Sequence, residues 1–406
     1  MAKSRSPMVI IFITVLIDLI GFGIVIPVLP LYAEKFGASE TVIGLLLAIY
    51  SLMNFVFSPI LGRLSDRVGR RPVLFLSIVG TSIGFLVMGL ADTLWLLFVA
   101  RTIDGITGGN ISTAQAYIAD ITPPEERSRS MGIIGAAFGL GFIFGPALGG
   151  ILSSISLAAP FYFAAGLAAA NAVALYFLLP ESLSAEHRSA ARRSAVSELF
   201  KEAGNWQLGA VFATYFFATI AFAMLTATYS LFTNHRFQLD ATHNGYLFAA
   251  QGLIGVLVQG IFLGRFIKIV NEKVLVVAGA ALLALGMFTL PLSFTLGALF
   301  LASAAIALGN SLLTPVLNGL ASKSVGAQWQ GRVLGALQSV ASLARVIGPA
   351  LGGWLLMRDA AKPNGDSYGY SPFWMAGAIM LIAFLLSLTL LAVKSKAVKN
   401  PLQQEG

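Results

Sequence analysis

Residues 62–71 read GRLSDRVGRR, with two glycines and one acid, Asp66, among four arginines. The stretch separates two apolar runs, at about 41–62 and 72–91, each with the roughly 20 residues that a helix needs to cross a bilayer core. The glycines permit a tight turn, and the acid beside several arginines can form a charge-assisted network at a membrane surface. A loop that only carries positive charge would need neither the acid nor both glycines. The stretch therefore predicts a specific junction between two membrane helices.

The composition of the whole chain agrees with a membrane protein. Of 406 residues, 57% are hydrophobic and only 11% are charged, whereas an ordinary soluble domain has about 25% charged residues. This balance excludes a soluble globular enzyme and a disordered chain. The chain has no Cys and three His, all in expected loops or at the edge of one, so we expect no metal site and no cofactor. The net charge of +8 is attributed to cytoplasmic loops, and no nucleic-acid partner is expected.

Twelve apolar runs predict an all-α membrane protein with twelve transmembrane helices. We place them at about 8–32, 41–62, 72–91, 94–120, 128–154, 158–179, 206–232, 242–264, 273–292, 295–320, 329–357 and 370–393. The first run is too long for the apolar part of a signal peptide, so we interpret it as an uncleaved helix. With the N-terminus inside, 20 of the 26 Lys and Arg lie in inner loops and tails and four in outer loops, which predicts that both termini are cytoplasmic.

Internal repeats divide the chain into two halves. GPALGG occurs at 145–150 and again at 348–353, and a weaker match pairs 62–74 with 264–276. We therefore predict an N-terminal six-helix bundle at 1–180, a cytoplasmic linker at 181–205 and a C-terminal six-helix bundle at 206–406. Pseudo-symmetric halves are typical of secondary transporters, whose substrate site lies between the halves near the midplane.

Four stretches carry a resemblance to a known family: Asp18 to Pro30, the junction at 62–72, Arg101 to Gly108, and 145–150. With these, the chain resembles the major facilitator superfamily, specifically its drug:proton antiporters and their tetracycline-efflux-like branch, over essentially its full length. The resemblance implies a conformational latch made of Gly62, Asp66, Arg67, Gly69, Arg70 and Arg71, whose arginines engage Asp120. It also implies an antiporter motif in the expected helix at about 128–154, made of Gly141, Gly145, Pro146, Gly149 and Gly150.

The glycines of the expected helix at about 128–154 have two interpretations that the sequence does not separate. Small residues allow close packing of membrane helices, which alone accounts for most of these positions. The resemblance adds that this close contact seals one side of the transporter during alternating access.

Three charged residues within apolar runs are candidates for proton coupling, because a charge inside a membrane costs several kcal/mol unless it is paired or faces a cavity. Asp18 lies about 15 Å into the first helix. Desolvation favours the neutral form of a carboxyl group, which suits reversible protonation, although a structural acid that helps the helix to pack is the alternative. Arg101 and Asp104 are three residues apart and share a helix face. The resemblance assigns coupling to Arg101, and Asp104 is either a second coupling acid or only the local partner of Arg101.

Arg345, in the expected helix at about 329–357, either faces the substrate cavity, where it can attract an anionic group or pair with an acid, or extends to the outer headgroups. Polar residues at membrane depth are further candidates for the substrate cavity, with helix–helix hydrogen bonding as the alternative role. The candidates are Asn110, Gln115, Tyr229, Gln251, Asn310, Gln338 and Arg345.

We therefore predict a proton-coupled secondary transporter that exports small amphipathic molecules or drugs by alternating access. The alternative is a sugar or metabolite exporter, or a facilitator without proton coupling. A membrane enzyme or receptor is a remote alternative, because no set of catalytic residues lies at membrane depth.

Tetracycline is not assumed as the substrate, because Gly84, Gly255 and Leu283 stand where the tetracycline-pump pattern has acids and a His. The expected partners are a small-molecule substrate, protons and the bilayer. The expected location is the plasma membrane, or the inner membrane of a Gram-negative source, and the expected state is a monomer.

Overall fold

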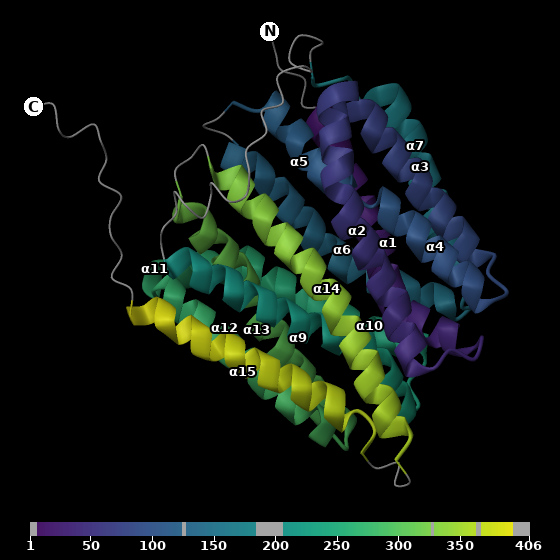
Figure 1. Cartoon of the computed structure of the whole chain (residues 1–406), viewed down its shortest axis with the longest axis vertical. Helices are drawn as coiled ribbons and strands as arrows, with labels where there is room; N and C mark the ends of the chain where they lie inside the picture. Colours follow the sequence, from purple (N-terminus) through teal and green to yellow (C-terminus); the bar gives the residue numbers. More distant parts are fainter. Residues whose placement is uncertain (1–5, 124–126, 184–205, 326–328, 363–366, 393–406) are drawn as a thin grey trace, which may run out of the picture.

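The computed structural model describes residues 6–123, 127–183, 206–325, 329–362 and 367–392, which form helices joined by short connections (Figure 1). The helices of the first half are α1 (Ser6–Glu34), α2 (Glu40–Val68), α3 (Arg70–Gly89), α4 (Leu94–Thr107), α5 (Asn110–Ile121), α6 (Arg127–Ser153) and α7 (Ala159–Leu178). Those of the second half are α9 (Trp206–Phe237), α10 (Ala241–Leu257), α11 (Leu263–Ile269), α12 (Glu272–Thr289), α13 (Leu296–Lys323), α14 (Gln330–Ala360) and α15 (Tyr370–Ala392). A π-helical segment, Val258–Phe262, joins α10 to α11, and a 3₁₀ turn, Leu290–Leu292, follows α12. Most of the expected linker at 181–205 lies outside the described residues.

Eleven helical spans of the described chain are long and apolar enough to cross a membrane. The fourth expected helix, at about 94–120, is not continuous. It breaks into α4 and α5 at Gly108–Gly109, where two residues without a Cβ weaken the helix. The side-chain amide of Asn54 in α2 donates to the carbonyl oxygen of Gly108 at 2.8 Å, so the break is supported by its neighbour.

The expected loop at 62–71 is also mostly helical. α2 continues to Val68 and α3 begins at Arg70, so that Gly69 alone separates them. Its φ of +120° lies where an L side chain is strained, which explains a glycine here. The prediction that Gly62 supports a tight turn is wrong: it lies inside α2, and a Cβ there would have no atom within 4 Å.

The helices gather into two groups that follow the two halves of the sequence (Figure 1). Within the first half α1 packs on α6 and α3 on α7, and within the second α12 packs on α13 and α14 on α9. Between the halves the main contacts are those of α2 with α14 and of α6 with α10.

The halves meet at one end of the molecule, which we call the closed end; there α1 ends, α2 begins and α14 ends (Figure 1). A Cβ on Gly44 would collide with the backbone of Pro349 and Gly353, and a Cβ on Gly150 would collide with that of Gly245. One apolar core is shared there, because Leu231, Leu356 and Tyr368 of the second half are buried with Ile24 and Val28 of the first.

At the opposite end, which we call the open end, the ribbons of α2 and α14 diverge (Figure 1). Glycines of α2, α6, α11 and α14 lie towards this end. A Cβ on Gly62, Gly135, Gly264 or Gly335 would have no atom within 4 Å. The molecule is therefore closed between its halves at one end and open at the other.

Candidate functional site

Asp18 lies in the middle of α1 and faces the break between α4 and α5. Asn110, the first residue of α5 and 2% exposed, donates its side-chain amide to Oδ1 of Asp18 at 2.6 Å. Asp18 has no ion pair with any described cation; its polar partner is an uncharged amide. The helix break therefore supplies the donor that holds this acid.

Arg101 and Asp104 form a buried ion pair on α4, with 2.8 Å between Nη1 and Oδ2. They are 1% and 5% exposed. The guanidinium of Arg101 also lies over the ring of Tyr50 in α2, 4.1 Å from its centre. Asp104 occupies the space beside Gly84 in α3, where a Cβ would be 3.1 Å from the Cβ of Asp104. The spacing of three residues thus yields the contact that the sequence predicted, and Tyr50 and Gly84 complete its surroundings.

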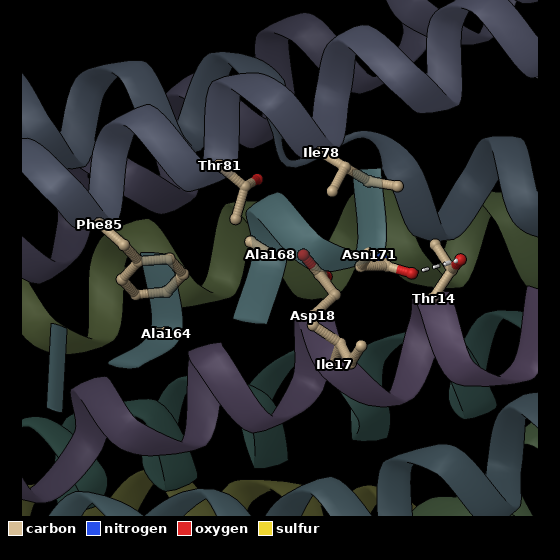
Figure 2. A pocket seen from close by; sticks show the side chains of 9 residues that line it. All are labelled: Thr14, Ile17, Asp18, Ile78, Thr81, Phe85, Ala164, Ala168 and Asn171. Carbon is tan, nitrogen blue, oxygen red and sulfur yellow. Dashed lines mark hydrogen bonds between the residues drawn. The ribbon is translucent and has the colours of Figure 1, made fainter. Parts of the chain in front are cut away.

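A small cavity adjoins Asp18 between α1, α3 and α7 (Figure 2). It has room for about one water molecule. Its polar lining consists of Asp18, Thr14, Thr81 and Asn171, and its other walls are apolar. All of the lining residues belong to the first half, and Asp18 itself is half-buried.

Arg345 of α14 is half-buried and lies close enough to Tyr50 of α2 and Tyr215 of α9 to act on both electrostatically. It makes no ion pair with an acid in the described part of the chain. Because Tyr50 belongs to the first half, the charge of Arg345 lies between the halves rather than at the headgroups.

The junction of α2 and α3 is held by ionic contacts at the open end. Arg70 contacts Asp66 at 2.6 Å and Asp120 of α5 at 3.1 Å, so the arginine-to-Asp120 contact implied by the resemblance is present. Glu181, which follows α7, accepts hydrogen bonds from the backbone N–H groups of Arg70 and Arg71 at 2.9 and 3.2 Å, where the positive end of the α3 dipole favours an anion.

The remaining arginines of the junction point elsewhere. Arg71 donates to the backbone oxygen of Tyr176 and lies over its ring, and Arg67 is exposed. All of these contacts are made within the first half, which agrees with the separation of the halves at this end.

The small residues of α6 face two directions. Gly141, Gly145 and Gly149 pack against Leu19, Gly23 and Ile24 of α1, so they hold two helices of one half together. Gly150 packs against Gly245 of α10 in the other half, and the carbonyl of Pro146 faces Gly245 as well. The two interpretations of this motif thus apply to different residues: most pack within a half, and its last turn packs between halves.

The polar cavity candidates separate into buried and accessible groups. Tyr229 is fully buried, 2.7 Å from Ser303 of α13 through its hydroxyl, and Asn110 is bonded to Asp18, so both are packed inside a half rather than facing a substrate space. Asn310 accepts from Thr314 one turn away at 2.9 Å. Gln115 and Gln251 are half-buried, and Gln338 is exposed.

Sequence reasoning missed five contributors: Tyr50, Asn171, Thr14, Thr81 and Glu181. The first four are polar residues within apolar runs, which is a usable signal, but their partners lie on other helices. Glu181 follows the last apolar residue of α7, and only packing brings it to α3. Among the described residues no cluster of three His, Cys, Asp or Glu could hold a metal ion.

Comparison with known proteins adds independent evidence. A family described as "Major Facilitator Superfamily" matches residues 11–349 and, in a second match, 211–406. The "Tetracycline resistance protein, class C" of Escherichia coli is 34% identical over 391 residues, covering 95% of this chain and 97% of its own. The "Multidrug resistance protein 2" of Bacillus subtilis is 28% identical and covers 95% of both chains.

Solved structures show the same fold. The human organic anion transporter MFSD10 is similar with a TM-score of 0.71 at 24% identity, covering 95% of this chain and 100% of its own. A bacterial homologue of the human lysosomal transporter Spinster has a TM-score of 0.78 at 17% identity, covering 98% and 100%.

Proposed function

Because the chain belongs to the Major Facilitator Superfamily, we propose that it is a proton-coupled exporter of small amphipathic molecules or drugs that works by alternating access. The predicted family is confirmed, and it is a family of transporters, so an enzyme or a receptor is no longer considered. The protein is a multi-pass protein of the plasma membrane.

The observation that carries the proposal is Asp18, an acid at membrane depth whose described partner is the amide of Asn110. An acid held by a cation stays ionised, whereas an acid held by an amide can gain and lose a proton. Arg101 and Asp104 neutralise one another nearby, which leaves Asp18 as the proton carrier of this site.

The two ends of the molecule support alternating access. The distribution of Lys and Arg among the loops supports a cytoplasmic position for the open end and both termini, and on this assignment the structure represents an inward-facing state. We assign residues 1–180 and 206–406 to two bundles that rock about the substrate site, with 181–205 as their cytoplasmic linker.

We assign a conformational role to the junction of α2 and α3. Its residues are Gly62, Asp66, Arg67, Gly69, Arg70 and Arg71, with Asp120, and in the described part of the chain the ionic contacts of Arg70 are made within the first half. When the cytoplasmic end closes, this surface meets the second half. The ion pairs of Arg70 then hold the surface in a fixed orientation.

Substrates are expected between the halves, where Arg345 provides a positive charge. A molecule with an apolar body and one acidic or zwitterionic group fits this setting. Tetracyclines are the first compounds to test because several relatives are named for resistance to them, and the drug substrates of multidrug resistance proteins come next. The working unit is expected to be a monomer.

The test uses purified protein in liposomes. Candidate drugs are first ranked by thermal stabilisation, since a ligand at 100 times its Kd adds about 2.7 kcal/mol to stability. A drug that binds should then accumulate when a pH gradient is imposed and redistribute when a protonophore collapses the gradient. Accumulation only to equilibrium, insensitive to the gradient, would instead show a facilitator without proton coupling.

A further inference from the structure

Four ionisable side chains, which we call the acid–histidine cluster, bridge the two halves at the closed end. Glu34, at the end of α1, and Glu40, at the start of α2, belong to the first half. His235, near the end of α9, and Tyr368, just before α15, belong to the second. Glu34 lies about 24 Å beyond Asp18 along α1, so this cluster is distinct from the site described above.

Tyr368 joins the two halves directly. It is 6% exposed and is buried with Ile24 and Val28 of the first half. Its hydroxyl donates to Oε1 of Glu40 at 3.3 Å. The ring of His235 stacks on the ring of Tyr368, with 4.1 Å between their centres and 22° between their planes. A side chain of the second half is therefore inserted into the first, and a histidine covers its ring.

His235 also lies beside the acids of the first half. Glu34 is close enough to Glu40 and to His235 for their charges to interact. Tyr368 is close enough to both acids for the same interaction. Glu34 and His235 are exposed, so both can exchange protons with the solution at this end.

The other charged groups of the described chain near this cluster leave that arrangement unchanged. Those of the second half have partners within it: Asp359 with Lys362, Asp240 with His243, Arg236 with the carbonyl oxygen of Pro291, and Arg358 with the ring of Trp354. In the first half, Lys35 and Asp92 are exposed and make no ion pair with a described residue. Protonation of His235 therefore places a positive charge beside two acids of the opposite half.

The direction of the pH effect follows from ordinary titration. A histidine gains its proton near pH 6.5, whereas a glutamate stays ionised above about pH 5. At mildly acid pH, His235 is a cation that attracts Glu34 and Glu40 as long as the halves are in contact. At alkaline pH its ring is neutral and this attraction is lost, while the bond between Tyr368 and Glu40 remains. Lowering the pH through this range therefore favours contact between the halves.

We propose that the acid–histidine cluster is a pH-sensitive lock on the closed end, which protonation of His235 tightens. On the orientation proposed above, this end faces the outside of the cell. An acid exterior then holds the outer end closed more firmly, and an alkaline exterior lets it open more readily. The inference goes beyond the proposed function: it needs alternating access and this orientation, but it does not need Asp18 to carry the proton.

The test measures the distance between the halves at this end by pulsed electron spin resonance on the purified full-length protein. Nitroxide labels are attached to Trp95→Cys, at the start of α4, and Ala298→Cys, at the start of α13, which are exposed positions in different halves of a chain without native Cys. Every protein also carries Asp18→Asn, so that titration of Asp18 does not contribute. This labelled protein is the reference. Between pH 8 and pH 5.5, we expect its ratio of short to long distances to rise about two- to fivefold, as is typical of exposed charge pairs.

The variants separate His235 from the other histidine of this end. In His235→Gln, which keeps a polar side chain and loses the charge, the ratio should not change with pH. Glu34→Gln combined with Glu40→Gln should abolish the response as well. His243→Gln is the matched control, because His243 is also exposed but its acid, Asp240, lies in the same half. It should respond to pH as the reference does.

Two results would overturn the lock: a reference ratio that does not change with pH, or a His235→Gln protein that responds as the reference does. Neither result bears on Asp18 as the proton carrier, because every protein here lacks that carboxyl group. Gly353→Leu, whose side chain collides with Glu40, provides the distance of parted halves. A single distance in all proteins, Gly353→Leu included, would contradict alternating access itself, and the lock with it.

Discussion

At the scale of single residues, the sequence predicts contacts between residues that are close in the chain, but it predicts contacts between residues far apart in the chain poorly. Arg101 and Asp104 are three apart on a helix, so their contact follows from helix geometry alone. The bond between Asn110 and Asp18 joins residues 92 apart, and it depends on how α1 packs against the break before α5. The acid could be named from its place in an apolar run, but its partner required the structure.

The ion pair of Arg101 and Asp104 gives the first prediction. Arg101→Leu leaves Asp104 buried without its partner, and breaking a buried pair costs about 3–5 kcal/mol. We expect a marked fall in the melting temperature of the purified variant. Arg101→Leu combined with Asp104→Leu should recover much of that loss, because no buried charge remains. A double variant as unstable as the single one would show that Asp104 is not the local partner of Arg101.

Arg345 gives the second prediction. Hydrogen bonds to charged groups contribute about 1.5–3 kcal/mol, so Arg345→Gln should weaken binding of an acidic or zwitterionic drug by about 10- to 100-fold. Arg345→Lys keeps the charge without the planar fork and should lose less. A neutral drug serves as the control and should bind all three proteins alike. Equal affinity of parent and Arg345→Gln for an acidic drug would remove Arg345 from the substrate site.

At the scale of elements, hydropathy finds the membrane helices but not their ends. It locates the apolar part of each helix, whereas the helices continue into polar residues; α2, for example, runs six residues beyond the predicted end, to Val68. The break at Gly108–Gly109 was also missed, because glycines are common within membrane helices and packing decides which of them interrupt the backbone. The same limit explains why Glu181 was not connected with α3.

The junction of α2 and α3 gives the third prediction. Gly69→Ala places a Cβ at a strained φ and into the carboxylate of Glu181, and a strained backbone of this kind costs about 1–3 kcal/mol. We expect a lower melting temperature. Adding Glu181→Ala removes the collision, so the two changes together should cost less than the sum of each alone. Strict additivity, measured in a double-mutant cycle, would show that Glu181 does not contact this turn in solution.

At the scale of the whole molecule, the repeats and the charge bias predict two halves with the substrate between them, but they do not predict which end is open. That property depends on a balance between two packings of the same surfaces. Four glycines of the closed end make contacts between the halves, namely Gly44, Gly150, Gly245 and Gly353, whereas a Cβ on Gly62, Gly135, Gly264 or Gly335 would have no atom within 4 Å.

The closed end gives the fourth prediction. Gly353→Leu inserts a side chain where Gly44 and Glu40 leave no space, so the halves should part at this end. The chain has no native Cys, which makes Ala241→Cys, at a position 3% exposed beside Gly150 in the second contact of the closed end, a clean probe. We expect several-fold faster labelling of the probe with Gly353→Leu. Gly297→Leu, at a position with open space, should leave labelling unchanged, and equal labelling in all three proteins would contradict the closed contact.

The central claim is that protonation of Asp18 couples the proton gradient to drug movement. The most direct measurement compares gradient-driven uptake with counterflow exchange of the same drug in liposomes containing the parent, Asp18→Asn or Asp92→Asn. Asp92 is an exposed acid and serves as the matched control. The account predicts that Asp18→Asn loses gradient-driven uptake and keeps counterflow, and that Asp92→Asn keeps both. Gradient-driven uptake at the parent rate in a folded Asp18→Asn protein would contradict it.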